Sequence, residues 1–305
     1  MKYEFDRNKT PVFEVEPGES FSIETEDAAS GYINEDTKAE DVPNLPYFDS
    51  HPPKANPVSG PVYIKGAEKG DLLVVSIEKI QVAAKGWTIF LPGSGPLGDS
   101  KSWSKCSEPF LQWIEHRDGK AYLNEDISWD LDPMIGTIGV APERQVKSTI
   151  WGQGPWGGNL DCRDMREGTK FYTTCYNDGG LLFVGDVHGS QGDTEFTGTA
   201  NETAAEVTLS CEIIKDKTIP FCRLETDNSY VSLFSSRPLE DAVKKAIINL
   251  MDWMVSEYGV EEEVAYMYPS INPDFKIEVY QMVNLGEIGY TVGAKLPKKY
   301  FKGQT

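Results

Sequence analysis

The sequence lacks several features that would assign it to a common protein class. It has only five cysteines in 305 residues, far apart, and none forms a Cys-x-x-Cys pair. This spacing argues against a zinc ribbon or a disulfide framework, so we expect buried or partly buried thiols. No apolar run reaches 18 residues, and the start MKYEFDRNKT lacks the basic-then-apolar order of a signal peptide. We therefore predict a soluble, cytoplasmic protein.

Basic residues are also scarce. The chain has 29 Lys and Arg against 48 Asp and Glu, which gives a formal net charge of -19. The phosphates of nucleic acids and anionic membranes would be repelled by such a surface, so neither is expected as a partner. The hydrophobic content of 39% is enough for a globular protein with a sizeable core.

Motifs of several enzyme classes are missing. There is no Gly-x-Ser-x-Gly elbow, and a catalytic triad would have to use His51, His116 or His188. A Cys–His pair formed by Cys162 or Cys175 with His188 stays possible but has no local signature. Two Gly-x-Gly-x-x-Gly matches, at 93–98 and 152–157, contain proline and lack a following helix pattern, so they do not predict a dinucleotide site.

The pattern of apolar residues predicts a mainly β chain with one clear helix. Alternation indicates strands at 62–64, 72–77, 171–177, 180–189, 196–215, 275–283 and 290–297. Asn-Asp-Gly-Gly at 177–180 is typical of a hairpin turn, and long loops are expected at 91–109 and 151–159. A helix is predicted from Pro238 to about residue 258, followed by Gly259, and a shorter one from 261 to 267, before Pro269.

The stretch VGDVHGSQGDTE at 184–195 is the strongest candidate site. Asp186 and His188 alternate on an extended chain, so both side chains project to one face, where a carboxylate and an imidazole can bind one divalent ion. Gly189 and Gly192 allow the chain to fold back and bring Asp193 or Glu195 close. The alternative is a charged hairpin tip with His188 bonded to a backbone carbonyl, and the spacing alone does not decide between them.

Two other acidic clusters could join this stretch. One holds Glu24, Glu26 and Asp27, and the other holds Asn159 and Asp161 after a glycine-rich loop. Each is weak alone because acidic turn residues are common. If the clusters line one cleft together with residues 184–195, they form a metal site.

Five longer phrases, taken in order, resemble the acetamidase/formamidase family. They are NPVSGPVYIKGAEKGDLLVVSIEKI, DPMIGTIGVAPE, GGNLDCRDMREGTKFY, GLLFVGDVHGSQGDTEFTGTANE and YQMVNLGEIGYTVGAKLPKKYF, and the resemblance runs from about residue 10 to about residue 302. Thr194 stands where the family usually has a second glycine, and Asn201 and the segment 173–175 also differ. His188, Gln191, Asp193 and Glu195 are retained, so these changes concern the substrate more than the reaction.

The resemblance implies a metal-associated amidohydrolase that cleaves small aliphatic amides to a carboxylate and ammonia. It also implies one unit over residues 1–305, with a jelly-roll-like β-sandwich part at about 1–215 and a smaller α/β part at about 216–305. A homodimer or a larger homo-oligomer is implied as well.

From these observations we formulate one hypothesis, hydrolysis by metal-activated water. A divalent ion, zinc or calcium, lowers the pKa of its bound water towards roughly 7. The expected metal ligands are Asp27, Asp161, Asp186 and His188, with Glu195 as proton acceptor and Asn159 as hydrogen-bond donor to the oxyanion. Gln191 and Trp156 are the expected substrate contacts. The alternatives are a hydrolase of a larger or cyclic amide, for which Trp151 and Trp156 would frame a flatter pocket, and a non-catalytic β-rich binding protein.

Overall fold

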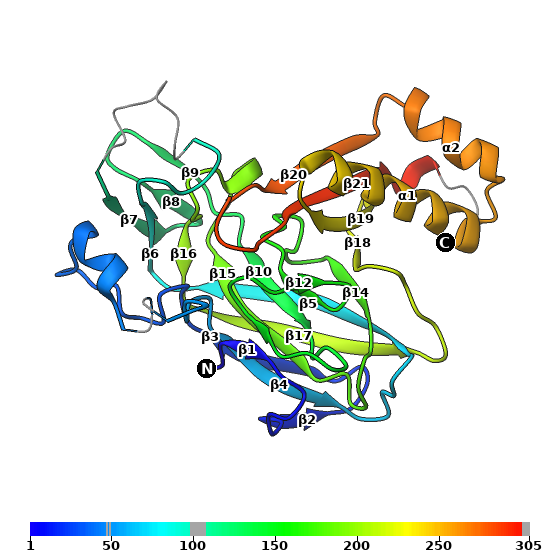
Figure 1. Ribbon diagram of the computed structural model, residues 1–305, viewed down its shortest axis with the longest axis horizontal. Coiled ribbons are helices and arrows are strands. Elements are labelled where there is room, and N and C mark those ends of the chain that lie inside the picture. Colours follow the sequence, from blue (N-terminus) through cyan, green and yellow to red (C-terminus); the bar gives the residue numbers. More distant parts are fainter. Residues whose placement is uncertain (47, 49, 98–107, 301–305) are drawn as a thin grey trace.

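The computed structural model describes residues 1–46, 48, 50–97 and 108–300 and shows two large β-sheets (Figure 1). The first sheet has eleven strands in the order β12-β13-β10-β15-β16-β6-β7-β8-β9, with β4 paired to β15 and β2 paired to β4. Its strands are β2 (Phe13–Val15), β4 (Val58–Ile64), β6 (Lys85–Phe90), β7 (Phe110–Arg117), β8 (Lys120–Tyr122), β9 (Ser128–Asp130), β10 (Met134–Val140), β12 (Gln153–Gly154), β13 (Gly157–Asn159), β15 (Leu182–His188) and β16 (Glu202–Thr203).

The second sheet has eight strands in the order β20-β21-β19-β18-β14-β5-β17-β3. They are β3 (Ser20–Thr25), β5 (Leu72–Val82), β14 (Lys170–Thr174), β17 (Ala205–Ile214), β18 (Arg223–Glu225), β19 (Ser229–Ser236), β20 (Lys276–Gln281) and β21 (Tyr290–Pro297). A further pair joins β1 (Glu4–Phe5) to β11 (Lys147–Ser148). Apart from the parallel pair β2–β4, the strand pairs named here are antiparallel.

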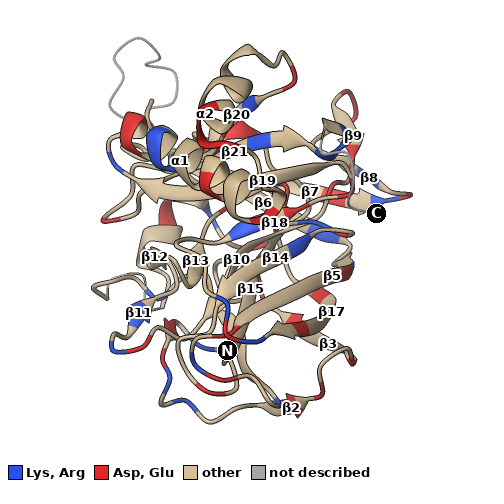
Figure 2. Ribbon diagram, turned by 90° about the vertical axis from the view of Figure 1, so that its right-hand side faces the viewer, with Lys and Arg blue, Asp and Glu red and all other residues tan. Residues whose placement is uncertain are grey.

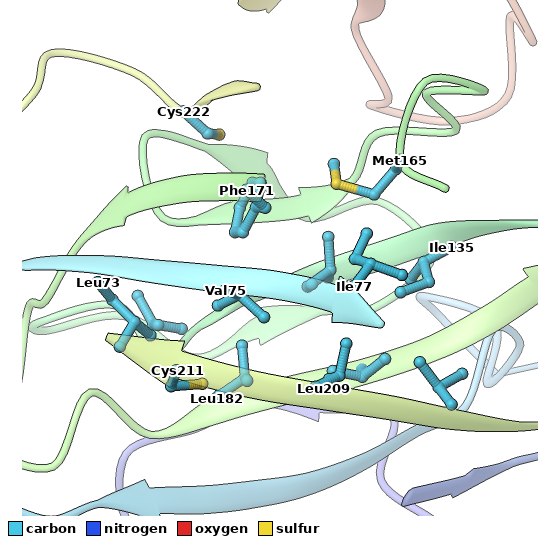
Figure 3. Close-up of a cluster of buried hydrophobic side chains, with 14 of the residues drawn as sticks. Leu73, Val75, Ile77, Ile135, Met165, Phe171, Leu182, Leu209, Cys211 and Cys222 are labelled. Atoms are coloured by element: carbon cyan, nitrogen blue, oxygen red, sulfur yellow. The ribbon is translucent and has the colours of Figure 1, made fainter. Parts of the chain in front are cut away.

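The two sheets pack face to face around one apolar core (Figure 3). Leu73, Val75 and Ile77 of β5 project from one sheet at every second position, as strand geometry requires. They meet Ile135 of β10 and Leu182 of β15 from the other sheet, and these five side chains are at most 2% exposed. The predicted mainly β, α+β fold with a β-sandwich is therefore confirmed.

The helical part covers one end of the eight-stranded sheet (Figure 1). Helix α1 (Leu239–Tyr258) buries Ala242, Ala246, Leu250, Trp253 and Met254 in a cluster that also contains residues of β19 and β21. It begins at Leu239, one residue after the predicted Pro238, which is the N-cap, and it ends before Gly259, whose φ of 64° lies in the left-handed region that glycine tolerates.

Helix α2 (Glu262–Ile271) is longer than predicted, because it continues through Pro269. The missing N–H of Pro269 removes a single helical hydrogen bond, and the amide of Asn272 still donates to the carbonyl of Tyr268 to close the last turn. The eight-stranded sheet itself crosses the predicted boundary between residues 215 and 216, since β18 pairs with β14.

Three predicted segments differ from the structure. The turn at 177–180 does not close a hairpin, because β14 pairs with β5 and β18 while β15 pairs with β10, β4 and β16, so the turn links the two sheets. The predicted loop at 151–159 contains the short hairpin β12–β13. The predicted strand at 196–215 forms only from residue 202, and residues 98–107 of the loop predicted at 91–109 lie outside the described residues.

The distribution of acidic residues and the length of the helices bear on the predictions about nucleic-acid and membrane partners. Figure 2 shows the positions of Asp and Glu residues along the ribbon, spread over loops, strand ends and helices rather than gathered on one side of the view. Within the described part of the chain, no helix combines the length and apolar character that crossing a membrane requires.

Candidate active site

The site forms where β15 ends, on the eleven-stranded sheet. His188 is the last residue of β15, and its neighbours across the sheet are Met134 of β10 and Glu202 of β16. Asp186 and His188 are both 1% exposed, and Asp186 Oδ1 lies 3.6 Å from His188 Nε2. Glu202 Oε2 lies 3.4 Å from the same nitrogen. Asp186 and His188 thus lie at one point as the sequence predicted, although the φ of 54° at Asp186 departs from the extended chain on which that prediction rested.

Two further carboxylates reach this point from irregular chain. Asp161 follows β13, and Glu195 ends the short 3-10 helix η3 (Asp193–Glu195). Both are buried, at 3% and 8% exposed. The backbone of Asp161, Asp186 and Glu195 has φ values of 43°, 54° and 46°, which non-glycine residues rarely adopt. Backbone strain in three residues whose side chains lie close together is typical of a functional site.

Glycine at position 136 makes room for the carboxylates. Gly136 lies on β10, and a Cβ added there would stand 2.8 Å from Asp161 Oδ1 and 2.9 Å from Asp186 Oδ2. Real Cβ atoms do not approach oxygen so closely, so any side chain would displace the carboxylates. Asp186 Oδ2 is held in addition by the amide of Asn56, at 2.6 Å, and by the hydroxyl of Thr137, at 3.0 Å.

Gln191 fixes the orientation of His188. Its Nε2 donates to the backbone carbonyls of Asp161, at 2.6 Å, and Tyr280, at 2.9 Å. The Oε1 atom must therefore face His188 Nδ1, 2.9 Å away, and accept its proton. In the neutral imidazole this leaves the lone pair on Nε2, which faces the carboxylates and is ready to bind a metal.

The four carboxylates leave buried oxygens without partners. Asp161 Oδ1, Asp186 Oδ1, Glu195 Oε2 and Glu202 Oε2 are buried and accept no hydrogen bond. Buried polar atoms almost always have a partner, so orphans of this kind point to an ion. Ligand atoms of Asp161, Asp186 and His188 lie within 4.8 Å of one another, and so do those of His188, Glu195 and Glu202. These residues fit a divalent cation.

Burial and mutual repulsion shift the titration of the cluster. Burial, with the nearby Asp186 carboxylate, raises the pKa of Asp161 to about 7. Burial also raises the pKa of Glu202 to about 8, although His188 partly offsets it, and it raises the pKa of Glu195 well above its ordinary value. Burial alone would lower the pKa of His188, but Glu202 and Asp186 outweigh it and raise that pKa. The cluster therefore gathers more negative charge than it can hold without a proton or a cation.

The cluster lines part of a cavity of about 180 Å³. Asp161, Asp186, His188, Glu195 and Glu202 line it, together with Asn56 and Asn159. Most of the remaining lining is apolar and comes from residues 28–55, 87–91, 150 and 283–288. These apolar residues are Ala28, Val42, Phe48, Pro53, Ala55, Trp87, Ile89, Leu91, Ile150, Val283, Leu285 and Ile288. A small molecule in this cavity would meet the carboxylates of the cluster and, over most of the remaining wall, hydrocarbon.

Asn159 lines the cavity as predicted for an oxyanion donor, but part of its amide is already used. Its Nδ2 donates to the carbonyl of Ile150 at 3.0 Å, and its Oδ1 lies 3.1 Å from the Thr137 hydroxyl. One N–H of the amide is left for a further acceptor.

Asp27 lies outside both groups of ligand atoms found among the described residues. Its Oδ1 accepts the backbone amides of Ala29 and Gly31, and its Oδ2 accepts the indole N–H of Trp87 at 3.2 Å. A short acidic side chain in a turn bonds to the following amides, and this local use leaves no free oxygen for an ion. We therefore leave Asp27 out of the ligand set.

The two predicted substrate contacts also differ from the structure. Neither Gln191 nor Trp156 lines the cavity. Gln191 lies behind His188, and all its polar atoms are used there. Trp156 packs against the core and over Gly154, and Trp151 stacks edge-on against His51 with ring centroids 5.0 Å apart. Trp87, which the sequence did not single out, is the indole at the cavity wall.

Asp193 points away from the cluster. Its Oδ1 pairs with Arg163 Nε at 2.9 Å, and half of its side chain is exposed. Glu195 is therefore the residue that the turn at 189–192 returns to the site. Glu202 joins it because β16 pairs with β15 in the register that sets Glu202 opposite His188.

Rival chemistries find little support in the same region. Burial raises the pKa of the Cys175 thiol to about 12 and that of Cys162 well above its ordinary value, so neither supplies a thiolate at neutral pH. The four described cysteines are free and buried, and Cys106 lies outside the described residues. The match at 152–157 continues into strand β13 rather than a helix, so it offers no helix N-terminus to a phosphate.

Comparison with known proteins identifies the family. The sequence model of the acetamidase/formamidase family matches residues 5–152 and 144–302. The chain belongs to this family. The resemblance predicted from five phrases is thereby confirmed over nearly the whole chain.

Solved acetamidases have the same fold. An acetamidase from Bacillus halodurans superimposes with a TM-score of 0.89 at 29% identity, covering 99% of this chain and 96% of that one. An acetamidase from Yersinia enterocolitica gives a TM-score of 0.88 at 32% identity, covering 99% and 90%. The acetamidase of Mycolicibacterium smegmatis is 26% identical over 66% of this chain and 63% of its own. The chain spans 61 to 63% of the length of the curated relatives that it matches.

Proposed function

We propose that the protein hydrolyses small aliphatic amides to a carboxylate and ammonia, with a divalent cation held by the cluster around His188. The observation that supports this most is the set of four buried carboxylate oxygens without hydrogen-bond partners beside a largely apolar cavity. Membership of the acetamidase/formamidase family supports the same reaction.

The ligand set of the proposal is Asp161, Asp186, His188 and Glu202. When bound, the cation would polarise the amide carbonyl and lower the pKa of a water molecule towards roughly 7. A nitrogen ligand among carboxylates favours zinc, because calcium takes oxygen ligands, and elemental analysis separates the two. Gln191 holds the lone pair of His188 towards the ion, and Gly136 keeps the space open.

The remaining polar groups handle the proton and the developing charge. Glu195 enters from η3, and its Oε2 has no partner, so it is placed to take a proton from the attacking water and pass it to the leaving amine. The unused N–H of Asn159 is the donor for the oxyanion, worth about 2.7 to 4 kcal/mol if well aimed. The apolar walls exclude water from the acyl group.

Two alternatives are distinguished by experiment. A hydrolase of larger, flat or cyclic amides was expected to use Trp151 and Trp156, and neither lines the cavity. A non-catalytic protein in which the ion only joins loops predicts no turnover at all. Assembly as a dimer or larger oligomer and a cytoplasmic location stay predictions.

The deciding experiment measures ammonia release from formamide, acetamide and propionamide, before and after chelation, with elemental analysis of the same sample. We expect chelator-sensitive release and about one tightly held metal per chain. In Glu195→Gln the metal should stay, and turnover should fall at least about 100-fold, because the proton acceptor is lost. Full turnover without metal would overturn the mechanism, and turnover unchanged in Glu195→Gln would remove Glu195 from it.

A further inference from the structure

The walls of the cavity next to the cluster differ in kind from its metal-binding end. Beyond the cluster, the lining is hydrocarbon apart from a few uncharged polar side chains, namely Asn56, Ser94, Asn159, Thr197 and Thr199. No lysine or arginine is among the described residues that line it. Several apolar wall residues are almost fully buried, including Val42 at 1%, Ile288 at 2% and Ile89 at 5% exposed. The walls therefore favour an uncharged, apolar group.

The size of the cavity exceeds what the smallest amides need. Its volume is about 180 Å³. An apolar cavity of about 150 Å³ takes up a benzene ring. Formamide and acetamide are smaller than benzene, whereas butyramide has as many non-hydrogen atoms. With the carboxamide at the cluster, an acyl chain of three or four carbons would extend along the apolar walls.

We infer that the protein prefers amides with an apolar acyl chain of about three to four carbons over acetamide, with Val42, Ile89 and Ile288 forming the chain-binding wall. This inference rests on the proposed amide hydrolysis and specifies its substrate class. When a methylene group of the substrate moves from water to such a wall, the free energy gained is about that of its transfer to hydrocarbon. This gain corresponds to roughly a fourfold rise in kcat/KM per methylene.

Val42 is the position that tests the wall. It lies in the 3-10 helix η1 (Ala39–Asn44), apart in sequence from every residue of the cluster. Replacing it by phenylalanine fills part of the cavity without adding charge. Val264, on α2 and 43% exposed, is the matched control for the same substitution.

The experiment compares kcat/KM for acetamide, propionamide and butyramide on the metal-loaded enzyme, with formamide as the reference that carries no chain. We expect a rise of roughly fourfold per methylene in the wild type and in Val264→Phe. In Val42→Phe the rise from acetamide to butyramide should vanish, while the metal content stays near the wild-type value. Succinamate, of similar length to butyramide but negatively charged, should be a poor substrate, since no lysine or arginine is among the described residues that line the cavity walls.

The outcomes separate the two proposals. A flat or falling series from acetamide to butyramide, with acetamide hydrolysed, overturns the chain preference and leaves amide hydrolysis intact. A rise that persists in Val42→Phe overturns the assignment of the wall. No release from any amide by the metal-loaded protein overturns the proposed function and the inference together. If Val42→Phe does not fold, Val42→Thr keeps the volume and adds a hydroxyl, and the expected result is a selective loss on butyramide.

Discussion

At the scale of single residues, Gln191 shows how a side chain outside the cavity can govern the site. Its three hydrogen bonds set the tautomer of His188, and Gln191→Ala removes the one that reaches Nδ1. We expect metal affinity to fall by about 10- to 100-fold, as for other groups that orient a metal-bound histidine. Competition with a chelator of known affinity measures this. The control is Asp193→Ala in the same turn, which should leave the affinity unchanged.

The same experiment decides between positioning and substrate contact. If Gln191 contacted the substrate, Gln191→Ala would raise KM with metal affinity unaltered, and the sequence-based role would be restored. Saturating metal should rescue turnover in the variant if Gln191 acts only through His188.

Residue patterns predicted some of the site and missed the rest for a physical reason. The spacing of Asp186 and His188 is a local signal, and the structure sets both at one point, although the left-handed backbone of Asp186 is not the extended chain that the prediction assumed. Asp27 has the right chemistry, but it uses its oxygens on nearby amides, and only the folded turn reveals this. Trp156 and Gln191 were predicted as substrate contacts from the sequence segments around them. The direction of a side chain depends on its packing in the folded protein, and neither side chain lines the cavity.

At the scale of strands and helices, the site depends on register. His188 faces Glu202 because β16 pairs with β15, and Asp161 reaches it from the end of β13. These strands are distant in sequence, so their register could not be predicted, whereas α1 was predicted from Pro238 to Gly259 because its signals are local. The wrong hairpin at 177–180 has the same cause, since a turn sequence specifies a reversal and not which strands then pair.

Gly136 gives a prediction that belongs to this scale, because it concerns the space between β10 and the two carboxylates. In Gly136→Ala the new Cβ would press on Asp161 Oδ1 and Asp186 Oδ2. The same Cβ would stand 2.8 Å from the backbone carbonyl oxygen of Asp186, so the chain must shift locally, and circular dichroism with thermal unfolding checks that the variant still folds. We expect bound metal to fall at least about tenfold, measured by elemental analysis after dialysis. Gly192→Ala, where a Cβ would meet nothing within 4 Å, is the control. Full metal occupancy in Gly136→Ala would mean that these carboxylates do not hold the ion.

At the scale of the whole molecule, a chain with a net charge of -19 buries four carboxylates at one point. In the metal-free protein, burial and then repulsion by the neighbouring Asp186 carboxylate raise the pKa of Asp161 to about 7 and that of Glu202 to about 8. A carboxyl group whose folded pKa lies above its unfolded value binds a proton on folding. Its destabilising effect is full above the folded pKa and disappears as pH falls towards the unfolded value near 4.

The chelated protein should therefore become more stable as pH falls from about 8 towards 5, by at most about 1.4 kcal/mol per pH unit for each group. The raised pKa of His188 acts in the same direction. Urea unfolding at pH 5.5, 7.0 and 8.5 measures the trend, and Glu202→Gln should reduce its slope because one titrating group is removed. An acidic chain also becomes more stable at lower pH because its net negative charge falls. This effect is nearly the same in the wild type and in Glu202→Gln, so it cancels when their two slopes are compared. With metal bound the trend should weaken or reverse, because protons then compete with the ion for the same oxygens. Equal slopes for the chelated wild type and Glu202→Gln would show that this carboxylate is not the buried, proton-binding group that the structure places beside His188.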